Sequence, residues 1–229
     1  LEPTTWVGSF SDAHNVIIDE ESALLYAVGT NLASGGLVVY DISEPANPQL
    51  LGDYSEAGYT HDAQAVVYHG PDTPHIGKPI VFGANANKLV ILDVTDPADI
   101  GSLSTTTYSS LSYTHQCWLT EDHRYLLLGD ELDEQNQGFN TRTMIWDVQD
   151  LENPFLLGEH FSEVEAIDHN QYVVGNLLFQ SNYRAGLRML SLTGVGEGEL
   201  SEIGYFDVDP NSNAALFSGT WSNYPYFES

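Results

Sequence analysis

Basic side chains are scarce in this sequence, where six Lys and Arg stand against 33 Asp and Glu in 229 residues. The formal net charge is −27 at pH 7. Because nucleic acids and anionic lipid surfaces are bound through clusters of Lys and Arg, the composition excludes nucleic acid as a partner. Cations are the expected small partners. Such an excess of acid is also typical of adaptation to a salty exterior, as in a marine bacterium, where ions screen the repulsion.

Cysteine and long apolar runs are scarce as well. The single cysteine, Cys117, excludes an intrachain disulfide and is expected to be a small buried residue rather than a nucleophile. No apolar run approaches the roughly 20 residues of a membrane-spanning helix. No charged and apolar leader opens the chain, so no signal peptide is visible.

Helical periodicity is missing too, and strand-like repeats take its place. Apolar runs end in Asp and a Pro-bearing or polar turn in "LVVYDISEP", "LVILDVTDP" and "TMIWDVQDL". Their aspartates, Asp41, Asp93 and Asp147, recur about every 50 residues and are expected to cap the turns through local backbone hydrogen bonds. Two further strand-like runs precede each unit, and a short one follows it.

Four strands per repeat predict an all-β fold, a β-propeller built from four-stranded antiparallel blades of about 50 residues. Four complete blades are expected at residues 12–55, 61–109, 114–162 and 166–208, within a single domain spanning residues 1–229. Residues 1–10 are expected to be the outer strand of a preceding blade, and residues 217–229 to begin a fifth. This arrangement favours a fragment of a longer propeller over a ring whose two ends share one blade.

A histidine opens each predicted blade beside an amide or carboxylate side chain; the four are His14, His61, His115 and His169. The first strand of a propeller blade lines the central channel, so we expect these imidazoles to meet at one level, with Trp221 at the matching place in the fifth blade. Imidazole is the commonest transition-metal ligand. Asp62 and Asp168, like Asp12, are expected to orient the imidazoles or to bind a hard cation directly. The alternative is a structural role, in which each His bonds to the backbone of the next blade. The remaining histidines, His69, His75, His123 and His160, are expected at the surface.

The acidic stretch "GDELDEQNQGFNTR", residues 129–142, is a second candidate cation site. Asp130 and Glu131 lead a cluster of oxygen ligands that suits Ca²⁺, although their spacing does not follow the EF-hand pattern. A solvated acidic loop is the alternative. Arg184 is expected to form an internal salt bridge, for which the carboxylates of residues 130–134 are candidate partners.

Several longer runs carry a family resemblance. The units that end in Asp resemble the LVIVD repeat. Together with "YTHDAQ", "THQCWLTED", "DHNQYVVGN" and "NYRAGLR", they resemble the choice-of-anchor B family of secreted bacterial β-propeller proteins. The resemblance implies a propeller exported to the cell surface or the medium. It supplies no reaction.

We therefore predict an extracellular β-propeller that acts as a binding or scaffold module, with a protein or surface glycan as its partner. A divalent metal ion, Ca²⁺ or a Zn-like transition metal, is the expected cofactor at the histidines. No catalytic residue is assigned, because phosphate-loop, HExxH and CxxC motifs are absent. Two alternatives stay open: a metal-dependent hydrolase, lactonase- or phosphoesterase-like, in which the ion activates water, and a structural surface or filament component that self-associates through open blade edges.

Overall fold

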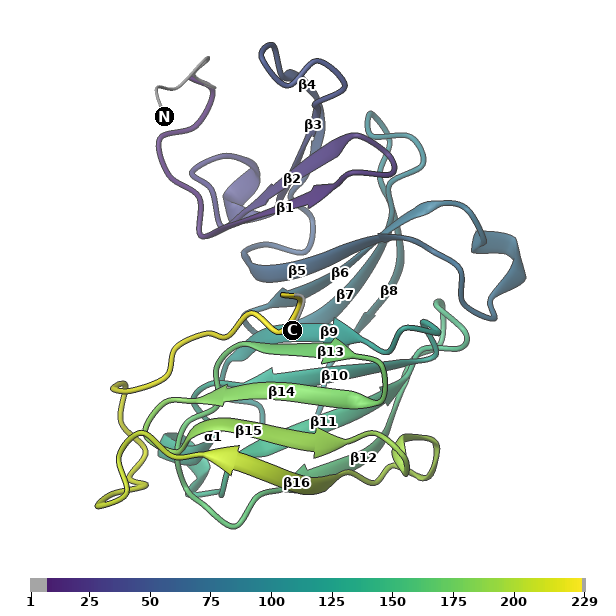
Figure 1. Cartoon of the computed structure of the whole chain (residues 1–229). Helices are drawn as coiled ribbons and strands as arrows, with labels where there is room; N and C mark the ends of the chain where they lie inside the picture. The colour runs from purple at the N-terminus through teal and green to yellow at the C-terminus, as the bar shows by residue number, and fades with distance from the viewer. Residues whose placement is uncertain (1–7, 228–229) are drawn as a thin grey trace. The chain divides into compact units, whose positions relative to one another are not determined.

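The strands of this protein form four antiparallel sheets of four strands each (Figure 1). The computed structural model describes residues 8–227. The chain folds into two compact units, of which the first ends at Thr106 and the second begins at Thr107. Each unit holds two sheets, and in every sheet the strands are ordered as they occur in the chain. The predicted all-β, propeller-like fold of four-stranded antiparallel blades is confirmed.

The first unit contains the sheets β1–β4 and β5–β8. The first sheet consists of β1 (Asn15–Asp19), β2 (Leu24–Val28), β3 (Leu37–Asp41) and β4 (Gln49–Tyr54). The second consists of β5 (Thr60–Val67), β6 (Pro79–Asn85), β7 (Lys88–Asp93) and β8 (Gly101–Thr106). Their shared core joins Tyr26 and Val39 to Val81 and Val90.

The second unit contains the sheets β9–β12 and β13–β16. The first of these consists of β9 (Thr114–Leu119), β10 (Tyr125–Asp130), β11 (Arg142–Asp147) and β12 (Phe155–Phe161). The other consists of β13 (Gln171–Val174), β14 (Leu177–Asn182), β15 (Gly186–Ser191) and β16 (Ser201–Phe206). Leu127 and Ile145 pack with Leu178 and Leu190 in the core of this unit. Burial of each such side chain stabilises the fold by about 1.5–3 kcal/mol.

Helix is rare, as the missing 3.6-residue period predicted. Between residues 8 and 227 there is one α-helix, α1 (Asp133–Gln137), and there are 3₁₀ turns at Ala33–Gly35, Thr73–His75 and Val195–Glu197. No helix in this part of the chain is long and apolar enough to cross a membrane.

The repeated aspartates cap the turns that follow their strands, as predicted. In each case one carboxylate oxygen accepts a hydrogen bond from the backbone N–H two residues later. The N···O distances are 2.7 Å from Ser43 to Asp41, 2.9 Å from Thr95 to Asp93 and 2.9 Å from Gln149 to Asp147. The turn chemistry is therefore the same in three consecutive blades.

In each unit, the outer strand of the first sheet carries a glycine at the point where a turn of the second sheet comes close. A Cβ atom added at Gly52 in β4 would overlap the carbonyl oxygen of Pro97, and one added at Gly158 in β12 would overlap that of Gly198. Both glycines lie beside a register shift in their strand pair. The spacing between the two sheets of each unit is thus set by main-chain contact.

The predicted partial blades have different outcomes. Residues 1–7 of the first lie outside the described residues. Residues 217–227 form no strand, and Thr220 alone makes an isolated antiparallel bridge to Tyr183. Gly219, directly before Thr220, has a φ of 120° and lies against the Tyr183 carbonyl, and Pro225 has no N–H to donate to a neighbouring strand.

Candidate metal centre

Two neighbouring inner strands of the second unit, β9 and β13, position the candidate site (Figure 1). His115 is the second residue of β9, Glu131 directly follows β10, and His169 lies two residues before β13. The side chain of Gln116 ties the two strands together. Its Nε2 donates to the Gln171 carbonyl at 3.1 Å, and its Oε1 accepts from the Gln171 N–H at 3.2 Å.

His115, Glu131 and His169 converge so that one ligand atom from each lies within 4.8 Å of the others. Nε2 of His115 is 3.7 Å from Oε2 of Glu131, and Nε2 of His169 is 3.4 Å from Oε1. Both imidazoles are buried, and their ring centroids are 4.3 Å apart. In the part of the chain that the structure describes, this is the one such group of three His, Cys or acidic residues.

Two aromatic residues complete this group. The Tyr183 hydroxyl donates to Oε1 of Glu131 at 3.1 Å, and its ring lies 5.3 Å from that of His169. The ring of Trp221 also packs against that of His169, at a centroid distance of 5.2 Å, while 61% of the Trp221 surface stays exposed. The predicted place of Trp221 beside the histidines is therefore confirmed for His169. Nothing in the sequence had singled out Tyr183.

The donor set suits a transition metal. Two imidazoles and one carboxylate bind Zn²⁺ and similar ions and leave coordination positions for water. Burial raises the pKa of Glu131 to about 7, although the hydrogen bond from Tyr183 favours the ionised carboxylate. A cation at this position would favour the ionised form further.

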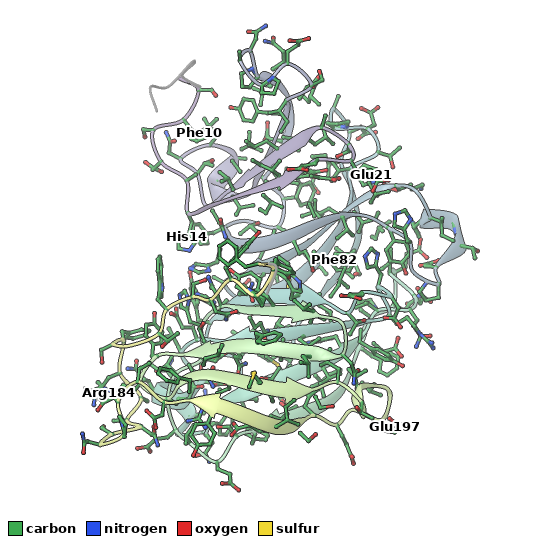
Figure 2. The ribbon with its side chains drawn as sticks, viewed as in Figure 1. Phe10, His14, Glu21, Phe82, Arg184 and Glu197 are labelled. Carbon is green, nitrogen blue, oxygen red and sulfur yellow. The ribbon has the colours of Figure 1, made fainter. Side chains whose placement is uncertain are left out.

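The first unit holds the other two predicted histidines as a pair of tilted rings in contact. The ring centroids of His14 and His61 are 3.8 Å apart, and burial lowers the pKa of His14. Figure 2 labels His14, which directly precedes β1. Oδ1 of Asp62 accepts hydrogen bonds from Asn15 Nδ2 at 2.8 Å and from the Ala63 N–H at 2.7 Å. This carboxylate fixes the start of β5. Within residues 8–227, no His, Cys or acidic side chain joins this pair to form a three-ligand group like that of the second unit.

Asp62 gives the first unit a defined pH dependence. Burial raises its pKa to about 7 in the folded protein. Because a raised pKa means that the folded state holds its proton more tightly, the contribution of Asp62 to stability is fully present below about pH 4 and is lost as the pH rises towards 7. Asp62→Asn should remove this loss, so at pH 8 the variant should exceed the wild type by on the order of 2 kcal/mol in free energy of unfolding. Urea unfolding at pH 4 and pH 8 measures it, and an equal difference at both pH values would contradict it.

The carboxylates of the acidic stretch are buried or half-buried, so their interpretation as a solvated loop is wrong, although residues 135–138 of the stretch are exposed. Asp130 accepts hydrogen bonds from the Tyr108 hydroxyl at 2.9 Å and from the backbone N–H groups of Ser112 and Tyr113 at 2.7 and 2.6 Å. Asp133 and Glu134 lie on α1 and are also buried. Arg142, at the start of β11, presents its guanidinium to Asp130 and Asp133.

Arg142 joins three acidic side chains. Its Nε donates to Asp133 Oδ2 at 2.6 Å and its Nη1 to Glu159 Oε1 at 2.9 Å, and Nη2 lies 3.8 Å from Asp130 Oδ2. Nη1 and Nη2 also donate to the carbonyls of residues 109 and 110, each at 3.3 Å. The guanidinium packs over the rings of Tyr108 and Phe139 at 5.4 and 5.2 Å. The sequence alone had not identified this network.

Other predicted positions are partly confirmed. Arg184, labelled in Figure 2, forms the expected salt bridge. Its partner is Asp209 at 3.3 Å rather than residues 130–134, whose basic partner is Arg142. Cys117 is buried as expected. The surface position predicted for His75 is wrong: it is 5% exposed and lies 3.9 Å from Asp93. The 3₁₀ turn Thr73–His75 carries it inward.

The comparisons with known proteins support the fold. The LVIVD repeat family profile matches residues 32–56 and 82–105. No curated protein matches the sequence. Among solved structures, a protein from Lactobacillus plantarum is 17% identical with a TM-score of 0.60; the match covers 84% of this chain and 56% of that one.

Two further structures give the same result. A functionally unknown protein from Desulfotomaculum acetoxidans is 12% identical with a TM-score of 0.60, over 89% of this chain and 59% of that one. Sqt1 from Saccharomyces cerevisiae is 11% identical with a TM-score of 0.62, over 95% and 53%. The chain thus spans little more than half the length of the structures it matches. It has a β-propeller-like fold with LVIVD repeats.

Proposed function

We propose that this protein is an extracellular binding or scaffold module that holds a transition metal ion at His115, Glu131 and His169. The observation that carries the proposal is the convergence of two imidazoles and one carboxylate within 4.8 Å. The LVIVD repeats and the acidic composition support an extracellular location. The choice-of-anchor B likeness, and a place for this chain within a longer propeller, are parts of the same proposal.

The surroundings of the site fit metal binding. The Tyr183 hydroxyl bonds to Glu131 and orients its carboxylate, as residues behind metal ligands commonly do. The ring of Trp221 lies against His169 and is itself exposed, so a partner that approaches the site meets an aromatic surface. Aromatic side chains are frequent anchors in protein and ligand interfaces.

Zinc binding is the direct test. Titration of the chelator-treated protein with Zn²⁺ should show one site per chain, and His115→Ala or His169→Ala should weaken its affinity by at least about 100-fold. Affinity should also fall from pH 7.5 to pH 5.5, because the imidazoles and Glu131 must lose their protons to bind. Isothermal titration calorimetry measures both effects.

His69→Ala is the matched control, because it removes an exposed histidine that is not one of the three ligands and belongs to the first unit. It should leave the zinc affinity unchanged. Tyr183→Phe keeps all three ligands and should weaken binding by only about 10-fold. A wild-type protein that binds no zinc, or a His169→Ala variant that binds it normally, would disprove the site.

A metal-dependent hydrolase is the second candidate function. It is favoured by the number of ligands, because catalytic zinc ions use three protein ligands and keep one position for water. Such an enzyme should hydrolyse members of an ester and lactone panel, lose turnover with EDTA and regain it with zinc. A zinc-loaded protein without turnover across the panel leaves the binding module as the function.

A further inference from the structure

Asp168 is a buried carboxylate whose oxygens have no hydrogen-bond partner among the described residues. It is 1% exposed, and between residues 8 and 227 neither Oδ1 nor Oδ2 meets a donor. Oδ2 lies so close to Gly129 that an added Cβ atom there would overlap it. The glycine in β10 therefore makes the space for this carboxylate. A buried, ionised carboxylate without compensation is strongly unfavourable, so Asp168 calls for a proton or a cation.

Three more acidic residues surround the same region of the second unit. Asp130, Asp133 and Glu134 are 0%, 0% and 4% exposed, and Oδ1 of Asp133 also lacks a donor in the described part of the chain. Burial, together with the charges of Asp133, Asp130 and Glu131, raises the pKa of Asp168 well above its usual value. Burial and the charges of Asp168 and Asp133 raise the pKa of Glu134 to about 11. Asp168 and Glu134 therefore face a common acidic interior.

Arg142 does not compensate this charge. Its Nε and Nη1 are engaged by Asp133 and Glu159, and its remaining donors are directed at main-chain carbonyls and at Asp130. Of the four buried carboxylates, only that of Asp133 accepts a hydrogen bond from the Arg142 guanidinium. The excess of negative over positive side chains therefore lies among buried residues and does not depend on the charge of the surface.

We propose that Asp168 and Glu134 bind a calcium ion in the second unit, as a second site that the proposed transition-metal function does not require. Both offer carboxylate oxygens, the ligands that hard cations prefer. Ca²⁺ accepts irregular geometry and main-chain or water oxygens beside carboxylates, whereas Mg²⁺ requires a near-ideal octahedron. The ion supplies the positive charge that Arg142 does not.

Thermal unfolding with CaCl₂ tests this site. At pH 7.5 and constant ionic strength, 1 mM CaCl₂ should raise the Tm of the wild type above its value in EDTA by at least about 5 °C. Asp168→Asn should abolish the shift, and in EDTA it should melt no lower than the wild type, because the amide carries no charge. Glu134→Gln should reduce the shift and decides the outcome if Asp168→Asn does not fold.

Two controls separate this site from others. Glu165→Gln removes an exposed carboxylate three residues from Asp168 and should keep the full calcium shift, as should His115→Ala, which removes a ligand of the proposed zinc site. Loss of the shift in Glu165→Gln would assign it to the surface charge and overturn the proposal. A wild type whose Tm rises on acidification but not with calcium would show that the carboxylates share protons instead, which also overturns it.

Discussion

Arg142→Met is expected to lower the free energy of unfolding by about 3–5 kcal/mol, because it removes one partner from a buried ion-pair network. Methionine keeps an apolar side chain at this position but removes the guanidinium, which packs over the rings of Tyr108 and Phe139. Asp133 then loses its 2.6 Å partner, and Glu159 loses a 2.9 Å one. Urea unfolding followed by tryptophan fluorescence measures the change, since Trp146 in the same strand is buried.

Arg124→Met is the matched control. Arg124 is exposed and donates to Gln149 Oε1 at 2.8 Å. Its replacement should change the free energy of unfolding by less than about 0.5 kcal/mol, as is usual for surface positions. Similar losses in both variants would show that the Arg142 network does not stabilise the second unit beyond an ordinary surface contact.

Gly158→Val should destabilise the second unit by about 3 kcal/mol, the upper end of the range for overpacking. The new side chain would meet the Gly198 carbonyl, which belongs to the backbone and cannot rotate away. The two sheets of the unit must then move apart. This would loosen the core in which Ile145 packs with Leu190.

Gly101→Val is the corresponding control, because a Cβ atom at Gly101 in β8 has no neighbour within 4 Å among the described residues and valine favours strands. It should be neutral or slightly stabilising. Chemical denaturation of both variants measures the difference. A Gly158→Val protein as stable as the wild type would mean that the outer strand does not set the sheet spacing.

The fold could be predicted because its turns and strands depend on short sequence patterns that repeat along the chain. Asp41, Asp93 and Asp147 each accept a hydrogen bond from the backbone N–H two residues later, so the local sequence is enough to predict the turn. The blade pattern follows from short apolar runs between such turns. The glycines at 52 and 158 carried a readable signal that was missed, since both stand in "LLG" of an outer strand.

The sequence predicted the residue types of the site but not which residues come together. His115, His169 and Glu131 were all candidates. That these three form a cluster, while His14 and His61 form a pair without a third ligand, depends on where the chain places Glu131 after β10. Arg142 was missed although Asp133 precedes it by only nine residues in the same acidic stretch. Tyr183 was missed because its partner, Glu131, lies 52 residues away. Long-range pairings of this kind have no local pattern in a sequence.

The two hydrogen bonds between the Gln116 side chain and the Gln171 backbone protect the inner edge of the second unit from pairing with a foreign strand. A sheet edge offers unpaired N–H and C=O groups that can recruit a foreign strand. At Gln171 the carboxamide of Gln116 occupies both groups, at 3.2 and 3.1 Å, with the same donor and acceptor that a peptide bond would present. A side chain thus imitates one residue of a neighbouring strand, so that β13 is closed to further pairing at this point while β9 and β13 remain members of separate sheets.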